Sequence, residues 1–167
     1  MTVRLAIVVP CYNEEEVLPE TNRRLLALLT KLHDLQLISV DSSIHYVDDG
    51  SKDGTWSLIE SLAAVDSRIH GIKLSGNRGH QNALLAGLLT VEGDAVVSID
   101  ADLQDDVSVI EAMVREFVSG AEVVYGVRDS RQTDTSFKRS TALMYYGLMK
   151  KMGVNLEWKA LSFDALL

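Results

Sequence analysis

Val96-Val97-Ser98-Ile99-Asp100-Ala101-Asp102-Leu103-Gln104 is a short apolar run that ends in two carboxylates, one residue apart, with an amide two places further on. Residues i and i+2 of an extended chain point to the same side, roughly 6.6 Å apart. Two such charges at about 5 Å repel each other by about 3 kcal/mol at an effective dielectric constant near 20. Solvent, protonation of one acid or a hard divalent cation can relieve that repulsion. Because open α/β sheets bind ligands at the carboxyl ends of their strands, the stretch favours a metal and nucleotide site.

Two other interpretations of this stretch are a solvated acidic turn and a calcium-binding loop. The second rests on residues that fall at positions 1, 3, 5 and 12 of such a loop, namely Asp100, Asp102, Gln104 and Glu111. That loop also needs a glycine at position 6 and a helix before it, whereas Asp105 stands there after a strand-like run. The calcium loop is therefore excluded, and the acidic turn stays open.

Strand-like and helix-like stretches alternate along the chain with short connections. Apolar runs predict strands at 3–9, 43–47, 69–74, 94–99 and 121–127, and apolar residues at helical spacing predict helices at 14–32, 55–65, 80–91, 107–118 and 137–152. Such alternation is typical of βαβ units and of a largely parallel sheet buried on both faces. We expect an α/β fold, a three-layer sandwich with a mostly parallel central sheet.

The composition is that of a soluble globular protein, with 47% hydrophobic and 24% charged residues among 167. The net charge of −8 argues against nucleic acid as a partner. Cys11 is the only cysteine, so no internal disulfide can form, which fits a reducing compartment. Apolar runs stay well below the roughly 18 residues of a membrane span, and 3–10 is too short for the apolar region of a signal peptide.

Polar clusters follow three of the predicted strands, at 10–14, 48–51 and 100–102. In a parallel sheet all three emerge at the same edge. There a tyrosine or backbone groups can hold a base, a carboxylate can accept ribose hydroxyls, and a metal can bridge a pyrophosphate. Neither a G-x-G-x-x-G loop nor a G-x-x-x-x-G-K-[ST] loop occurs in the sequence, so phosphates must be held by metal and side chains.

Together these clusters resemble the motifs of family 2 glycosyltransferases of the GT-A fold, a Rossmann-like fold that binds nucleotide sugars. The resemblance rests on Val8-Val9-Pro10-Cys11-Tyr12-Asn13-Glu14-Glu15, on Val47-Asp48-Asp49-Gly50-Ser51-Lys52-Asp53-Gly54-Thr55 and on 100–104, with support from 77–79, 83–87, 124–128 and 137–139. The branch that looks most similar is that of the dolichyl- and polyprenyl-phosphate sugar synthases. The match covers about residues 3–152. We therefore expect a catalytic domain over 1–152 and an atypical tail over 153–167, truncated relative to the family.

The resemblance implies roles for individual residues. The nucleotide sugar is expected to contact Pro10, Tyr12, Glu14, Tyr46, Asp48, Asp100, Ala101, Arg128 and Arg139. The cofactor is expected to be Mg²⁺ or Mn²⁺, held by Asp100, Asp102 and Gln104. The catalytic residues implied are Asp100, Asp102 and Arg128, with the two arginines on donor or acceptor phosphates. Turn or capping roles stay open for Asn13, Asp49 and Asp53, and His80 is either a donor contact or a surface residue at a helix start.

The reaction that the resemblance implies is transfer of a sugar from a UDP- or GDP-linked donor to a polyprenyl phosphate, with inversion and a divalent metal. A phosphate monoester is largely dianionic at neutral pH, because its second pKa is near 6, so this acceptor needs no strong base. Two alternatives stay open. One is transfer to a sugar hydroxyl in cell-wall or surface polysaccharide synthesis, and the other is a truncated domain that binds a nucleotide sugar without catalysis.

The same resemblance implies a location in the bacterial cytoplasm, at the cytoplasmic face of the membrane, in the synthesis of the cell envelope. Contact with the membrane is expected to use C-terminal elements of the family that this sequence lacks. A homo-oligomer stays open as well, since apolar residues of the predicted helix at 137–152 fit either core packing or a contact between copies.

Overall fold

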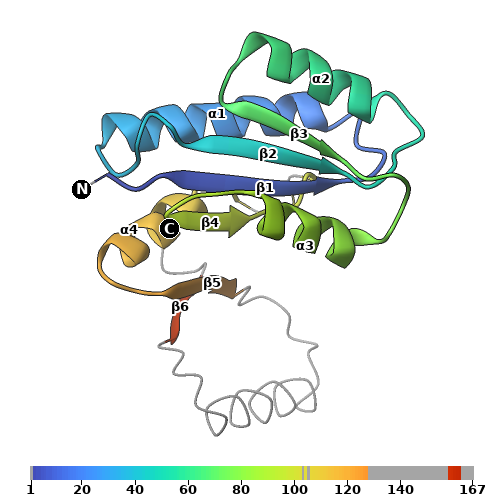
Figure 1. Ribbon diagram of the computed structural model, residues 1–167. Coiled ribbons are helices and arrows are strands. Elements are labelled where there is room, and N and C mark those ends of the chain that lie inside the picture. Colours follow the sequence, from blue (N-terminus) through green and yellow to red (C-terminus); the bar gives the residue numbers. More distant parts are fainter. Residues whose placement is uncertain (1, 103, 105, 128–157, 163–167) are drawn as a thin grey trace, which may run out of the picture. The chain divides into compact units, whose positions relative to one another are not determined.

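The computed structural model describes residues 2–102, 104, 106–127 and 158–162. The chain divides into two compact units, 1–111 and 112–167. In the first unit, β1 (Leu5–Cys11), β2 (Ser43–Asp48), β3 (Ile69–Lys73) and β4 (Ala95–Ser98) form a parallel sheet in the order β3-β2-β1-β4 (Figure 1). The pairing confirms the predicted parallel sheet.

Helices cover both faces of this sheet (Figure 1). On one face lie α1 (Leu18–Asp34), to which Tyr46 of β2 is hydrogen-bonded through Asn22, and α2 (Thr55–Val65), which packs against β3. On the other face lies α3 (His80–Thr90), where Ala83 is buried with Val8 and Val47. These three layers confirm the predicted α/β sandwich.

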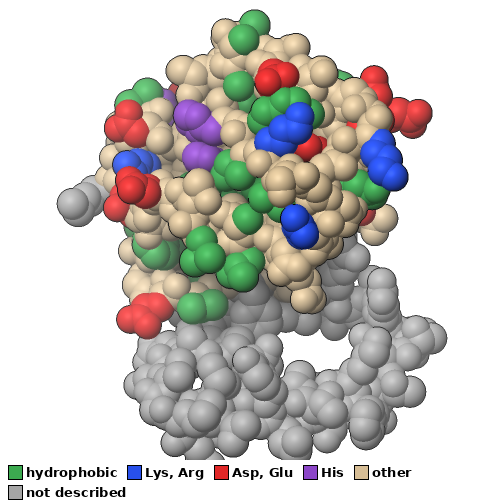
Figure 2. All heavy atoms as spheres, turned by 45° about the vertical axis from the view of Figure 1, so that its right-hand side comes forward, with side chains coloured by type: hydrophobic (Ala, Val, Ile, Leu, Met, Phe, Trp, Pro, Cys, Tyr) green, Lys and Arg blue, Asp and Glu red, His purple; other side chains and the backbone are tan. Residues whose placement is uncertain are grey.

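The helix α3 approaches the sheet closely because Gly87 has no side chain. A Cβ at this position would lie 2.5 Å from Cγ1 of Val8, which is closer than two non-bonded carbon atoms approach each other in proteins. The outer side of α3 is also apolar, since Leu85, Leu88 and Leu89 are exposed. In Figure 2, hydrophobic side chains are visible at several places on the surface of the molecule.

The central strand β1 is buried along its whole length. The sequence predicts that it ends before Pro10, but the strand continues through Pro10 to Cys11. Val8 accepts a hydrogen bond from the N–H of Ile99, so the even-numbered residues of β1 turn their backbone groups toward β4. The backbone of Pro10 therefore also faces β4, but β4 ends at Ser98. The missing N–H of Pro10 thus falls at the end of the hydrogen-bond ladder between β1 and β4, where proline is tolerated.

The start of α1 differs from the predicted one, at Leu18 instead of residue 14. Asn13 has a φ of 56° in the left-handed region, and Pro19 stands in the first helical turn, where a missing N–H loses no hydrogen bond. Asn13 keeps the helix from extending back to the end of β1, and Pro19 favours a start near residue 18, later than apolar periodicity indicates. The other predicted ends of described elements lie within two residues of the observed ones.

The helix α4 (Val109–Val118) spans the boundary between the units in sequence, and β5 (Val123–Val127) pairs in parallel with β6 (Trp158–Ser162) in the second unit. The sequence does not predict β6, because five residues carry too little periodicity to reveal a strand whose partner is distant in the chain. The predicted helix at 137–152 lies outside the described residues. Among the helices that the structure describes, none has the length and apolar character needed to cross a membrane.

Candidate functional site

The order in which the chain adds strands to the sheet reverses at β1, so that β2 and β4 lie on opposite sides of this strand. From β1 the chain passes through α1 to β2 and on to β3 on one side, and α3 then carries it to β4 on the other side of β1. In open α/β sheets such a reversal leaves a crevice at the carboxyl ends of the two strands, and ligands bind there. The residues that follow β1 and β4 therefore border the expected ligand site.

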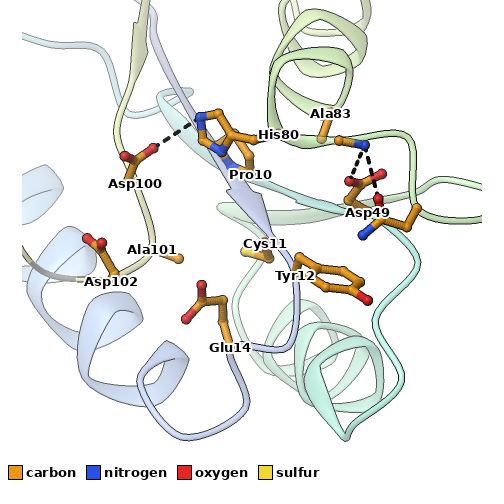
Figure 3. Close-up of a pocket in the computed structure, with 12 residues that line it drawn as sticks. Pro10, Cys11, Tyr12, Glu14, Asp49, His80, Ala83, Asp100, Ala101 and Asp102 are labelled. Carbon is orange, nitrogen blue, oxygen red and sulfur yellow. Dashed lines mark hydrogen bonds and ion pairs between the residues drawn. The ribbon is translucent and has the colours of Figure 1, made fainter.

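A cavity of about 230 Å³ lies at this point (Figure 3). The end of β1 and the loop after it contribute Pro10, Cys11, Tyr12 and Glu14, and the loop after β4 contributes Asp100, Ala101 and Asp102. The remaining lining residues come from the end of β2, the turn before α3 and α3 itself: Asp49, Asn77, Gly79, His80 and Ala83. The three polar clusters of the sequence thus meet around one cavity.

One wall of the cavity is acidic and consists of Glu14, Asp100 and Asp102 (Figure 3). Burial raises the pKa of Glu14, and the carboxylates of Asp102, Asp53 and Asp100 raise this pKa further. Lysine and arginine are absent from the described residues that line the cavity. The wall therefore carries concentrated negative charge, and a cation would relieve it.

The donor atoms of this wall fit a hard cation, because carboxylate oxygens are the ligands that Mg²⁺ and Mn²⁺ prefer. Within the described residues, no three histidine, cysteine, aspartate or glutamate side chains converge closely enough to hold a metal by themselves. Gln104 is exposed, and its backbone N–H donates a 3.0 Å hydrogen bond to Oδ1 of Asp102. The residues thus fit a cation that takes some of its ligands from a bound molecule, as Mg²⁺ often does from substrate phosphates.

The opposite wall is the start of α3, and Asp49 holds it in place. Asp49 is 2% exposed, and its two carboxylate oxygens accept hydrogen bonds from the backbone N–H groups of Arg78 at 2.6 Å and Gly79 at 2.8 Å. Gly50 has a φ of +70°, and a Cβ there would lie 2.6 Å from the carbonyl carbon of Gly76. Carboxylate and glycine together fix the turn from which α3 begins.

An ion pair joins the two walls. Nε2 of His80, the first residue of α3, lies 3.5 Å from Oδ1 of Asp100, and the side chains are 57% and 54% exposed (Figure 3). The pair links the loop after β4 to the turn that Asp49 fixes. Of the three acids on this wall, Asp100 therefore has a partner in α3, whereas Asp102 and Glu14 lie further from His80 (Figure 3).

Cys11, which lines the cavity, and Asp48, its partner in the neighbouring strand, are both buried. Burial raises the pKa of the Cys11 thiol, and the nearby charges of Glu14 and Asp48 raise it further, so the thiol stays protonated and serves packing. Asp48 is fully buried, and its Oδ1 accepts a 3.2 Å hydrogen bond from the N–H of Ser51. Its Oδ2 has no hydrogen-bond partner in the part of the chain that the structure describes.

Most residues that the sequence singles out meet at the cavity, but not all. Those that line it are Pro10, Tyr12, Glu14, Asp100, Ala101 and Asp102. Asp48 and Gln104 do not line it. Arg128 and Arg139 lie outside the described residues, so their expected phosphate contacts stay predictions.

Tyr46 is placed differently from the expectation. Its side chain is fully buried, and its hydroxyl donates a 3.0 Å hydrogen bond to Oδ1 of Asn22 on α1. The residue stands two positions before the end of β2, on the face that α1 covers, and it is not among the residues that line the cavity. Tyr46 thus lies beside the cavity-lining segments and not among them, and its expected contact with the nucleotide sugar stays a prediction.

The turn roles that the sequence leaves open are found for two residues. Oδ1 of Asn13 accepts a 2.8 Å hydrogen bond from the N–H of Lys52, and Oδ1 of Asp53 accepts one of 3.1 Å from the N–H of Thr55. The contact of Asn13 joins the loop after β1 to the loop after β2, and so does a 3.3 Å hydrogen bond from the N–H of Glu15 to Oδ2 of Asp53. Both residues shape the cavity's surroundings without lining it.

Sequence reasoning missed Asn77 and Gly79 as lining residues. They stand in the turn that follows β3, a fourth parallel strand whose carboxyl end reaches the same edge. The signal was therefore present, since every strand of a parallel sheet delivers its following loop to that edge. His80, left open between a surface role and a donor contact, lines the cavity.

Comparison with known proteins places this architecture among glycosyltransferases. A family model described as "Glycosyl transferase family 2" matches residues 6–164. The uncharacterized glycosyltransferase YkoT of Bacillus subtilis (strain 168) is 52% identical over 161 residues, which are 95% of this chain and 48% of the relative. The bactoprenol glucosyl transferase of Shigella phage SfV is 37% identical over 150 residues, 90% of this chain and 47% of the relative. The chain thus spans about half the length of the curated relatives that it matches.

Solved structures of glycosyltransferases share the fold. The mannosyltransferase PcManGT from Pyrobaculum calidifontis, in complex with GDP-Man and Mn²⁺, has a TM-score of 0.58 at 23% identity, over 79% of this chain and 37% of that one. S. aureus TarS 1–349, in complex with UDP-GlcNAc, has a TM-score of 0.56 at 21% identity, over 81% and 38%. The likeness confirms the predicted GT-A fold.

Proposed function

This chain belongs to glycosyl transferase family 2, and we propose that its cavity binds a nucleotide sugar and a divalent cation for transfer of the sugar to a polyprenyl phosphate. The acceptor is inferred from relatives named bactoprenol glucosyl transferases, one of them 37% identical over 90% of this chain. For the donor we infer a UDP- or GDP-linked sugar, with UDP and a hexose preferred. Such a reaction would take place at the cytoplasmic face of the membrane.

The observation that carries this proposal is the acidic wall at the point where the sheet reverses. Glu14, Asp100 and Asp102 come from two different strand ends and face one cavity. Carboxylates alone would repel a nucleotide diphosphate. With a cation between them and the phosphates, the same carboxylates become a binding site.

The cation would be held by Asp100 and Asp102, with Gln104 as the further ligand that the sequence suggests, and it would be Mg²⁺ or Mn²⁺. When bound, the ion supplies positive charge that stabilises the leaving diphosphate. Because Asp102 is exposed and its loop is anchored by the Ala101 carbonyl, which accepts a 2.7 Å hydrogen bond from Thr21, the carboxylate is presented from a fixed backbone.

The remaining lining residues would hold and orient the donor. Tyr12 is 38% exposed and offers its ring to the base, beside Pro10. Asp48 does not line the cavity but is paired in the sheet with Cys11, which does, and its Oδ2, without a partner among the described residues, would accept a hydrogen bond from a base or ribose donor that reaches it. Arg128 and Arg139 would hold donor or acceptor phosphates, so that the already ionised acceptor attacks without a strong base.

The decisive experiment measures binding of UDP, GDP and their sugars by calorimetry, with and without Mn²⁺. For the wild-type chain we expect binding that depends on Mn²⁺, and for Asp102→Ala a loss of at least about tenfold in affinity. Asp34→Ala is the matched control, because it removes a carboxylate from the exposed end of α1, outside the cavity. Binding that is independent of Mn²⁺ and unchanged in Asp102→Ala would refute the site.

The acceptor is tested separately, by incubating the chain with labelled UDP-glucose and a bacterial lipid extract. Label that enters the lipid fraction supports the polyprenyl-phosphate acceptor. Label that enters a polysaccharide fraction instead would favour a sugar hydroxyl as acceptor. Tight, Mn²⁺-dependent nucleotide binding with no incorporation would favour a domain that binds the donor without catalysis.

A further inference from the structure

His80 is the one side chain able to carry a positive charge among the described residues that line the cavity. Its Nε2 lies 3.5 Å from Oδ1 of Asp100, which is longer than the 2.7–3.2 Å of a good N–H···O hydrogen bond. Both side chains are more than half exposed, and such ion pairs contribute little to stability. The imidazole is therefore free to exchange Asp100 for a better acceptor.

The backbone that carries His80 is fixed on both sides. Gly79, the preceding residue, donates its backbone N–H to Oδ2 of Asp49 in a 2.8 Å hydrogen bond. Ala83, three residues further on, is buried in the cluster that joins α3 to the sheet. Because the helix start cannot shift, only rotation of the imidazole about its side-chain bonds is needed to change partners, and Figure 3 shows the ring pointing into the site.

The two walls of the cavity differ in what they offer to an anion. Glu14, Asp100 and Asp102 offer only acceptors when ionised, whereas the imidazole of His80 offers an N–H donor. A diphosphate presents several charged oxygen acceptors, so it can bind the acidic wall only through a cation but can bind His80 directly. A cation on Asp100 would also remove the present partner of the imidazole.

We propose that His80 donates a hydrogen bond to a phosphate oxygen of the donor's diphosphate, taking this oxygen in place of Asp100 when a cation binds there. The inference rests on the proposed nucleotide-sugar site and adds to it a contact from α3. It makes His80 a residue that recognises the diphosphate and leaves recognition of the base to other side chains.

The experiment compares nucleoside diphosphates with their nucleosides. Affinities of UDP, GDP, uridine and guanosine are measured by calorimetry in the presence of Mn²⁺ for the wild-type chain, His80→Ala and His80→Gln. We expect His80→Ala to weaken binding of the diphosphate about tenfold and to leave binding of the nucleoside unchanged. His80→Gln should restore much of the loss, since its amide is also an N–H donor.

Gln81→Ala is the matched control, because Gln81 is the next residue of α3, is exposed and does not line the cavity. Equal losses for nucleoside and diphosphate in His80→Ala would overturn the proposal, since they would indicate a general distortion of the site. No loss for either would also overturn it. If the wild-type chain binds neither diphosphate with Mn²⁺, the proposed function itself fails; if Asp102→Ala weakens binding while His80→Ala does not, the contact alone fails.

Discussion

Replacing Asp49 by asparagine tests whether the wall formed by α3 depends on one buried carboxylate. Each oxygen of Asp49 accepts one backbone N–H, from Arg78 at 2.6 Å and from Gly79 at 2.8 Å, and the residue is 2% exposed. Asparagine has the same shape but only one acceptor oxygen. Its NH₂ group would face an N–H donor, so one of the two hydrogen bonds is lost.

The magnitude follows from the kind of hydrogen bond that is lost. A hydrogen bond to a charged group contributes about 1.5–3 kcal/mol. The neutral amide is easier to bury than a carboxylate, which offsets part of this. We therefore expect Asp49→Asn to lower the free energy of unfolding by about 2 kcal/mol, equivalent to a melting temperature lower by roughly 4–8 °C for a chain of this size.

Urea unfolding followed by circular dichroism measures the global effect, and hydrogen exchange of the Arg78 and Gly79 amides measures the local one. Both amides should exchange faster in Asp49→Asn. The comparison variant is Asp53→Asn, since Asp53 also accepts two backbone N–H groups, from Glu15 and Thr55, but is exposed. The loss of stability in this variant should stay below about 1 kcal/mol. Equal stabilities of the two variants, with both amides still protected, would refute the role assigned to Asp49.

Two further substitutions and one pH dependence test the packing of the first unit. Gly87→Ala places a Cβ 2.5 Å from Cγ1 of Val8, and we expect a loss of about 1–2 kcal/mol in urea unfolding, because overpacking outweighs the gain in helix propensity. Tyr46→Phe leaves the buried Oδ1 of Asn22 without its hydroxyl donor and should lower the free energy of unfolding by about 1–2 kcal/mol. Burial, together with the stacked histidine of β3, lowers the pKa of His45 from 6.5 to about 4. Protonation therefore favours the unfolded chain, and stability should fall as the pH drops from 6.5 to 4, by about 1–2 kcal/mol once screening of the half-buried ring is allowed for.

Each of these expectations has a clear contrary result. Unchanged stability of Gly87→Ala would mean that α3 can move away from the sheet without loss. For Tyr46→Phe, a gain in stability would show that burying the hydroxyl costs more free energy than its hydrogen bond to Asn22 contributes. His45→Gln should remove the acid-dependent loss, so an identical pH profile in this variant would assign the titration to another group.

The parallel sheet and the acidic wall could be predicted from the sequence because their signals are local. The apolar run of β4 and the carboxylates Asp100 and Asp102 are adjacent in the chain, and a parallel topology then brings every such strand end to one edge. The same logic placed Tyr12 and Glu14 at the cavity. For these residues the local pattern and the topology suffice.

Tyr46 and Asp49 show what the local pattern leaves out. Alternation along a strand says that neighbouring side chains point to opposite faces, but not which helix will cover each face. Tyr46 lies on the face that α1 covers, and so its hydroxyl pairs with Asn22. Asp49 is hydrogen-bonded to Arg78 and Gly79, which follow it by 29 and 30 positions in the chain, and only folding brings these residues together.

The acids at this edge divide into two groups by the partners they have, and the division connects stability with binding. Asp49 is paired with backbone N–H groups, so its charge supports the fold. The pKa of Glu14, in contrast, is raised, first by burial and then by the carboxylates of Asp102, Asp53 and Asp100. An acid whose pKa is higher in the folded chain than in the unfolded one makes the ionised fold less stable at neutral pH. The proposed cation at this wall would offset the part of that penalty that comes from the neighbouring carboxylates, and this part would add to the affinity of the chain for the cation and, through the cation, for a diphosphate.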